Sequence, residues 1–152
     1  MVNRRFWLGM LVMLLVFGVT VVGCNNDPDN GNGGGKTDPA LNGTWIGTER
    51  GMEIELKLNN GSLEQSIDGV LAGKGTYTTS GNNITTQTTH LHGDFYGLES
   101  KWYPANELLT IMNAPAEVIS TTITPQTGTY TISGNTLTMT LRGQTTILTR
   151  KN

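Results

Sequence analysis

The 152-residue chain contains a single cysteine, and only 14% of its residues are charged. One cysteine cannot form an intrachain disulfide, so the fold must depend on a packed core rather than on cross-links. Ordinary domains have about 25% charged residues, and the lysines and arginines of this chain form no basic patch along the sequence. The sequence therefore excludes a disulfide-rich scaffold and argues against nucleic acid binding.

Motifs of catalytic and nucleotide-binding sites are also missing. No serine lies in the Gly-x-Ser-x-Gly turn that a nucleophile elbow requires. The glycine-rich run 31–35 lacks the preceding strand and following helix of a phosphate-binding loop. Glu53 and Glu55 share one face of a predicted strand, but that face points to solvent. We therefore expect no enzyme activity and no cofactor.

The cysteine lies at the end of the one long apolar run. Arg4 and Arg5 precede an uncharged apolar segment, 6–22, which ends at Gly23 and Cys24. A positive start, an apolar stretch and small residues at its end are typical of an export signal. An uncleaved anchor helix is the alternative, since a run of this length is near the lower limit for spanning a bilayer.

The segment Val21-Val22-Gly23-Cys24 resembles the lipobox of bacterial lipoproteins, in which the signal is cut before the cysteine and the thiol is acylated. The resemblance implies a lipoprotein signal peptide over 1–23 and a lipid on Cys24 that anchors the protein to a membrane of the bacterial cell envelope. Residues 24–40, rich in Asn, Asp, Gly and Pro, form a flexible tether in this interpretation. Cleavage removes two of 10 basic residues, which leaves 8 against 12 acids and a net charge near −4.

Residues 41–152 suit one domain, and its last part, 128–150, contains two tight turns that join three strands. Gly134-Asn135 is a turn signal, because glycine supplies the positive φ that a type II′ turn needs at its first position. The second turn is Arg142-Gly143 or Gly143-Gln144. Side chains alternate along a strand, so these turns put one set of residues on a shared face: Tyr130, Leu137, Met139, Leu141, Leu148 and Arg150.

A shortened copy of this hairpin lies upstream. The segment 75–85, GTYTTSGNNIT, repeats the pattern Gly-Thr-Tyr-Thr-x-Ser-Gly-Asn and predicts a turn at Gly81-Asn82. Tyr77 is then the counterpart of Tyr130 and faces Thr86. Thr79 faces Ile84 on the same inner face. The face then continues with polar residues, in contrast to the downstream copy: Thr86, Thr88, His90 and His92.

The start of the domain alternates in the same way. Turns at Arg50-Gly51 and Asn60-Gly61 predict three strands, and a loop over 69–73 leads to the repeat hairpin. The pairing puts Trp45 opposite Leu56. One face then gathers the apolar residues of all three strands: Trp45, Ile54, Leu56, Leu58, Leu63 and Ile67.

Residues 92–126 lack this alternation and predict a helical insert. Pro104 is suited to start a short helix over 105–109, and Asn113 to cap another with Glu117 in its first turn. A strand within 95–102 is the competing interpretation. Five strands precede the insert and three follow it, which predicts an all-β, eight-stranded antiparallel up-and-down barrel or sandwich. A closed barrel of this size holds side chains or one small ligand.

Gly43-Thr44-Trp45 resembles the Gly-x-Trp opening of lipocalins, and the domain from 41 to 151 resembles bacterial lipocalin-like lipoproteins. The resemblance implies an eight-stranded barrel with a lipophilic ligand inside. It also implies that Trp45 closes the barrel at one end, with an arginine of the last strand, here Arg150, lying over the indole.

These expectations converge on a half-polar interior that binds a small hydrophobic or amphipathic ligand. The candidate contacts come from both hairpins: Tyr77, Thr86, Thr88, His90, Tyr130 and Met139. Alternatively, the threonines pair with one another in a filled barrel, and the apolar insert docks a partner protein. A weaker alternative is a metal site, since His90 and His92 are spaced for chelation on one strand face. Two ordinary histidines at a strand end fit that spacing as well.

Overall fold

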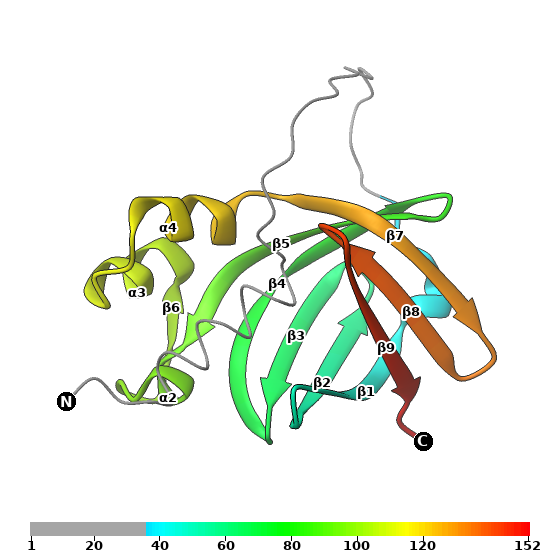
Figure 1. Cartoon of the computed structure of the whole chain (residues 1–152), viewed down its shortest axis with the longest axis horizontal. Coiled ribbons are helices and arrows are strands. Elements are labelled where there is room, and N and C mark those ends of the chain that lie inside the picture. Colours follow the sequence, from blue (N-terminus) through cyan, green and yellow to red (C-terminus); the bar gives the residue numbers. More distant parts are fainter. Residues whose placement is uncertain (1–35) are drawn as a thin grey trace, which may run out of the picture.

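Eight strands form a closed antiparallel ring in the computed structural model, which describes residues 36–152 (Figure 1). The strands of the ring are β1 (Gly43–Glu49), β2 (Met52–Asn59), β3 (Ser62–Ile67), β4 (Val70–Ser80), β5 (Asn83–His92), β7 (Gln126–Ser133), β8 (Thr136–Leu141) and β9 (Gln144–Arg150). Their order is β4-β3-β2-β1-β9-β8-β7-β5, and pairing between β4 and β5 closes the ring. The short strand β6 (Trp102–Pro104) pairs with β5 outside the ring. The predicted eight-stranded barrel is confirmed.

The hairpins of the ring turn on two residues each. Positive φ at both positions, the pattern of a type I′ turn, occurs at four of them: Arg50-Gly51, Asn60-Gly61, Asp68-Gly69 and Arg142-Gly143. In the two repeat hairpins only the glycine has positive φ, 56° at Gly81 and 57° at Gly134, as a type II′ turn requires. The loop predicted over 69–73 is wrong, because Asp68-Gly69 is itself a sufficient turn and β4 begins directly at Val70.

The predicted register is confirmed in every hairpin for which it was derived. Trp45 pairs with Leu56, and Ile54 pairs with Ile67. In the repeat hairpins, Tyr77 pairs with Thr86, and Tyr130 with Met139. The turn residues therefore determine which side chains point into the ring for as long as the pairing beyond each turn stays regular.

One irregularity changes the end of β5. Gly75 pairs with Thr88, but the next pair is Lys74 with His90, so Thr89 is an extra residue in β5. An extra residue of this kind reverses the alternation beyond it. Leu91 is therefore fully buried on the inner side, and the expectation that His90 and His92 continue the face of Thr88 is wrong.

The repeat begins with glycine for a steric reason. A Cβ on Gly75 would collide with the backbone oxygen of Gln87, and a Cβ on Gly128 with that of Thr140. Neither glycine has a positive φ, so the requirement is close approach of the neighbouring strand rather than an unusual backbone conformation. Glycine at such positions lets a strand bend sharply, as ring closure demands.

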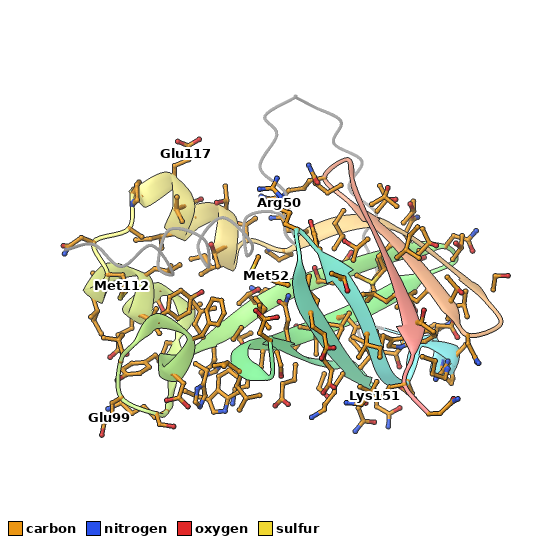
Figure 2. The ribbon with its side chains drawn as sticks, turned by 60° about the horizontal axis from the view of Figure 1, so that its bottom comes forward. Arg50, Met52, Glu99, Met112, Glu117 and Lys151 are labelled. Carbon is orange, nitrogen blue, oxygen red and sulfur yellow. The ribbon has the colours of Figure 1, made fainter. Side chains whose placement is uncertain are left out.

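The buried apolar residues form two clusters. The first combines inward-facing residues of the ring with Leu41 of the 3₁₀ turn η1 (Pro39–Leu41): Leu41, Trp45, Leu56, Leu58, Leu63, Tyr77, Ile84, Tyr130, Leu137, Met139, Leu141 and Leu148. The second includes helix α3 (Ala105–Ile111): Ile67, Ala72, Leu91, Ala105, Leu108 and Leu109. Figure 1 shows α3 together with α2 (Gly93–Tyr96) and α4 (Ala116–Ile123) at one side of the ring. Met52, beside the β1–β2 turn, and Met112, from the insert, both pack against the second cluster (Figure 2).

The insert differs from its prediction in two details. Helix α3 starts directly after Pro104, as expected, but Asn113 caps no helix. Asn113 has a φ of 54° and follows the end of α3, whereas α4 begins at Ala116 after Pro115. Asparagine tolerates the left-handed conformation, which suits it to ending a helix as well as to starting one. The competing strand within 95–102 is confined to Trp102, the first residue of β6.

The predicted signal peptide, Cys24 and residues 24–35 of the tether lie outside the described residues. From residue 36 onward the chain is in contact with the barrel, because Thr79 donates its backbone N–H to the oxygen of Lys36 at 2.7 Å. None of the helices between residues 36 and 152 has the length and apolar character needed to cross a membrane.

Candidate ligand-binding site

Trp45 and Arg150 close one end of the barrel. The two residues are paired across β1 and β9, and the guanidinium carbon lies 4.1 Å from the centre of the indole ring. Trp45 is fully buried and donates its Nε1–H to the oxygen of Leu41 at 2.8 Å. Arg150 donates to the backbone oxygens of Asn42 and Ala40, both at 2.7 Å. The arginine therefore fastens the segment before β1 over the end of the ring.

Tyr77 and Tyr130 belong to the same closed end. The Tyr130 hydroxyl donates to the carboxylate of Asp38 at 2.8 Å, and the Tyr77 hydroxyl donates to the side-chain oxygen of Asn42 at 3.2 Å. Burial raises the pKa of both phenols, and the hydrogen bond to Asp38 raises the pKa of Tyr130 further. Both tyrosines thus hold the covering segment in place. Their hydroxyls already have partners, and neither ring lines the pocket described next.

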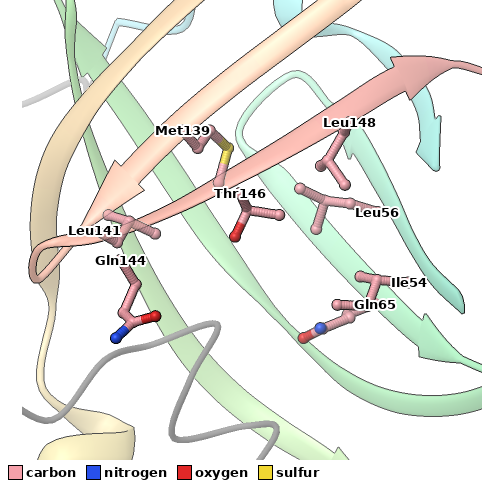
Figure 3. Close-up of a pocket in the computed structure, with 8 residues that line it drawn as sticks. All are labelled: Ile54, Leu56, Gln65, Met139, Leu141, Gln144, Thr146 and Leu148. Atoms are coloured by element: carbon pink, nitrogen blue, oxygen red, sulfur yellow. The ribbon is translucent and has the colours of Figure 1, made fainter. Parts of the chain in front are cut away.

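Eight side chains line a small pocket inside the ring (Figure 3): Ile54, Leu56, Gln65, Met139, Leu141, Gln144, Thr146 and Leu148. They come from β2, β3, β8 and β9. Gln144 and Thr146 are half-buried, whereas the other six are buried. The free volume is about 20 Å³, which is room for about one water molecule. Of the predicted ligand contacts, Met139 lies in this pocket.

Three buried polar side chains point into the otherwise apolar interior. Gln65, Thr86 and Thr88 are 1%, 1% and 4% exposed. Neither amide atom of Gln65 and neither threonine hydroxyl has a hydrogen-bond partner among residues 36–152. Each buried polar group without a partner costs about 1–3 kcal/mol of stability. These atoms need water or a ligand, which fits the predicted polar side of the interior at Thr86 and Thr88.

Gln65 was missed by the sequence analysis, although a signal for it was present. It lies two residues from both Leu63 and Ile67, whose side chains point inward, so the period of two places it on the same face. The prediction gathered only the apolar members of that face. A polar residue inside an apolar inner row is the informative exception.

His90 does not belong to the set of buried polar side chains that point into the interior. It pairs with Lys74 and Pro104, and its Nδ1 lies 3.0 Å from the hydroxyl of Thr89. His92 packs edge-on against Trp102, with ring centres 4.7 Å apart, and its Nδ1 is 3.6 Å from a carboxylate oxygen of Asp94. No group of three or more metal-binding side chains occurs in the part of the chain that the structure describes.

Arg142 connects the turn before β9 to the helical insert. Its Nε donates to the side-chain oxygen of Gln126, and its Nη2 donates to the backbone oxygen of Thr121 at 3.1 Å. Burial lowers the pKa of this guanidinium, which nevertheless remains charged at neutral pH.

Comparison with protein-family models, curated proteins and solved structures finds no match for this chain. The functional argument therefore rests on the residues of the barrel interior.

Proposed function

We propose that this protein is an exported, lipid-anchored barrel that binds one small amphipathic molecule inside the ring. The proposal rests on the polar atoms of Gln65, Thr86 and Thr88, which have no hydrogen-bond partner in the described part of the chain although they lie in a mostly apolar interior. A barrel filled only for stability gains nothing from burying these groups, because apolar side chains of similar size would pack there without loss.

The lipocalin-like architecture of the barrel supports the same function. The barrel has eight antiparallel strands, and the tryptophan of its Gly-x-Trp opening is covered by an arginine of the last strand. Proteins with this arrangement carry small lipophilic molecules in the barrel, which is the activity we propose for this chain. The pocket adjoins the Trp45 cluster, because four of its lining residues belong to both: Leu56, Met139, Leu141 and Leu148.

The small free volume of the pocket limits the size of the ligand. About 20 Å³ is room for about one water molecule, so a larger ligand requires side chains to move. Met139 is suited to this, because methionine has three rotatable bonds and repacks readily. Strands β1 and β9 pair at only two positions, Trp45–Arg150 and Ile46–Thr149, so few hydrogen bonds hold the wall beside the pocket.

Native mass spectrometry of the full chain, extracted from the membranes of the producing bacterium, tests the proposal. We expect a small molecule that stays bound to the wild-type protein and is missing from Thr88→Ile, which fills the interior. Thr85→Ile is the matched control, because Thr85 is a less buried neighbour on the same strand and bonds to Thr127 at the surface. It should keep the molecule. A bare chain in all three proteins would contradict ligand binding.

A chain without a bound molecule would favour the second candidate function, a surface protein with a filled barrel that docks a partner protein. The water-sized cavity agrees with this candidate. So does the insert, where Ile111 of α3 is 50% exposed.

Export and lipid attachment have a separate test. We expect the wild-type chain to fractionate with membranes and to begin at an acylated Cys24. Cys24→Ser should remain uncleaved and lack the mass of the lipid. A wild-type chain that starts at Met1 with an unmodified thiol would contradict this part of the proposal and support an anchor helix instead.

A further inference from the structure

The amide of Gln65 is the most deeply buried polar group that borders the pocket. It is 1% exposed, and both Nε2 and Oε1 lack a partner among residues 36–152. Gln65 pairs across the sheet with Leu56 on one side and Gly73 on the other. Since Gly73 has no side chain, nothing on that neighbour can engage the amide. Figure 3 shows the Gln65 side chain directed into the pocket beside Ile54.

A carboxamide presents a donor and an acceptor side by side in one plane. Its best partner is a group with the complementary arrangement, such as a second carboxamide. A planar amide satisfies both atoms together through two parallel hydrogen bonds, and its carbon skeleton also fills the apolar space beside them. The amide donor and acceptor of Gln65 together therefore select among ligands more strongly than a single hydroxyl would.

The lack of charged side chains in the pocket restricts the chemical class of the ligand further. None of the eight lining side chains is charged. A carboxylate brought here would lose its hydration without gaining a positive partner, and an ammonium group would lose its hydration without gaining a negative one. The remaining lining is aliphatic apart from Gln144 and Thr146, which suits a short hydrocarbon tail.

From this geometry we infer that Gln65 is the specificity-determining residue of the pocket and that the ligand is a neutral, short-chain molecule bearing a carboxamide or a similar planar donor–acceptor pair. The inference rests on the proposed function, because it names the ligand class for the same interior. Gln65 pairs with the polar group of the ligand, and Met139 repacks around its tail.

The test uses the full chain in lipid nanodiscs with ¹³C-labelled methionine methyl groups. The Met139 signal, assigned by its loss in Met139→Leu, is followed during titration with butanamide, butan-1-ol, butanoate and butylammonium at neutral pH. We expect butanamide to shift the Met139 signal and to bind about tenfold more tightly than butan-1-ol. Butanoate and butylammonium should have no effect at the same concentrations.

Gln65→Leu should remove the preference, so that butanamide and butan-1-ol bind equally. Gln144→Leu is the matched control, since it removes the half-buried amide of the same pocket, and it should keep the preference. The comparison of the four probes on the wild-type protein stands even if Gln65→Leu does not fold.

Two results would overturn the inference, and they differ in meaning. Equal binding of butanamide and butan-1-ol by the wild-type chain, or tighter binding of either ion, would reject the ligand class while leaving small-molecule binding intact. No shift of Met139 by any of the four probes would reject both the inference and the proposed function.

Discussion

At the scale of single residues, Arg150 contributes most by joining chain segments that are far apart in the sequence. It contacts the indole of Trp45 and two backbone oxygens, at Ala40 and Asn42. Hydrogen bonds from a charged donor contribute about 1.5–3 kcal/mol, and an arginine over an aromatic ring about 0.5–2 kcal/mol. These contributions overlap because they share one side chain.

We predict that Arg150→Lys lowers the free energy of unfolding by about 2–3 kcal/mol, because an ammonium group cannot reach both oxygens while remaining over the ring. Urea denaturation measures the change. Arg50→Lys, a substitution of the same type in an exposed turn, should change the free energy by less than about 0.5 kcal/mol. Equal stability of Arg150→Lys and wild type would show that the arginine is not needed to close the barrel.

A second residue-scale prediction concerns pH. A hydrogen bond from the ammonium group of Lys151, at 2.6 Å, holds the pKa of Glu55 below its usual range. A folded pKa below the unfolded one stabilises the fold above the unfolded pKa, and this contribution is lost as the pH falls through the folded value. The loss therefore occurs at acidic pH, below about 4.

We expect Glu55→Gln to flatten the decline of unfolding free energy in that pH range, and Lys151→Met to flatten it in the same way. Urea denaturation at a series of pH values measures the slope. Parallel curves for the wild type and both variants would contradict the assignment of the ion pair.

At the scale of secondary structure elements, the hairpins depend on glycine in two distinct ways. Gly134 needs its positive φ of 57°, and nothing lies within 4 Å of where its Cβ would be. Gly128 has an ordinary φ, but its Cβ would meet the oxygen of Thr140. The first requirement is conformational and the second is steric.

We predict that Gly134→Ala lowers the free energy of unfolding by about 1–2 kcal/mol, the cost of a left-handed backbone for a residue with a Cβ. Gly128→Ala should lower it by about 3 kcal/mol, because the clash is with backbone and cannot be relieved by a side-chain rotation. Thermal unfolding of the two variants compares them directly. A larger effect at Gly134 would contradict the explanation given for the repeated glycine.

The hairpins were also the elements most accessible to prediction from sequence. Two-residue turns such as Asn60-Gly61 and Gly134-Asn135 fix the register of both flanking strands, so the inward-facing residues follow by counting. The extra residue at Thr89 has no comparable local signal, because it depends on how β4 and β5 pair over their whole length. For this reason His90 was assigned to the inner face and Leu91 was not.

In the candidate site, too, some features follow from the local sequence and others depend on packing between distant residues. Thr86 and Thr88 were predicted because they face Tyr77 and Gly75 in a hairpin whose turn is clear. Their lack of hydrogen-bond partners could not be predicted, since it depends on every side chain that packs across the interior. Tyr77 and Tyr130 were placed correctly on the inner face, but their contacts with residues 36–42 depend on where that segment lies, and the sequence does not indicate its position.

At the scale of the whole molecule, the barrel has one end closed by paired side chains and backbone. Its interior contains polar atoms that have no hydrogen-bond partner within residues 36–152. Closing this end is the structural role of the tryptophan, the arginine and both tyrosines of the repeat. The polar atoms account for the difference between the two repeat hairpins, one apolar and the other rich in inward threonines. We propose that this interior holds a small molecule and that Met139 repacks around it.

Ligand binding inside the ring is tested most directly by finding which residues a ligand contacts. Intermolecular nuclear Overhauser effects between butanamide and the methyl groups of the full, methyl-labelled chain report that place. We predict contacts with Ile54 and Met139, which lie inside the ring. Contacts only with Ile111 and Ile147, which are 50% and 63% exposed on the outside, would contradict it.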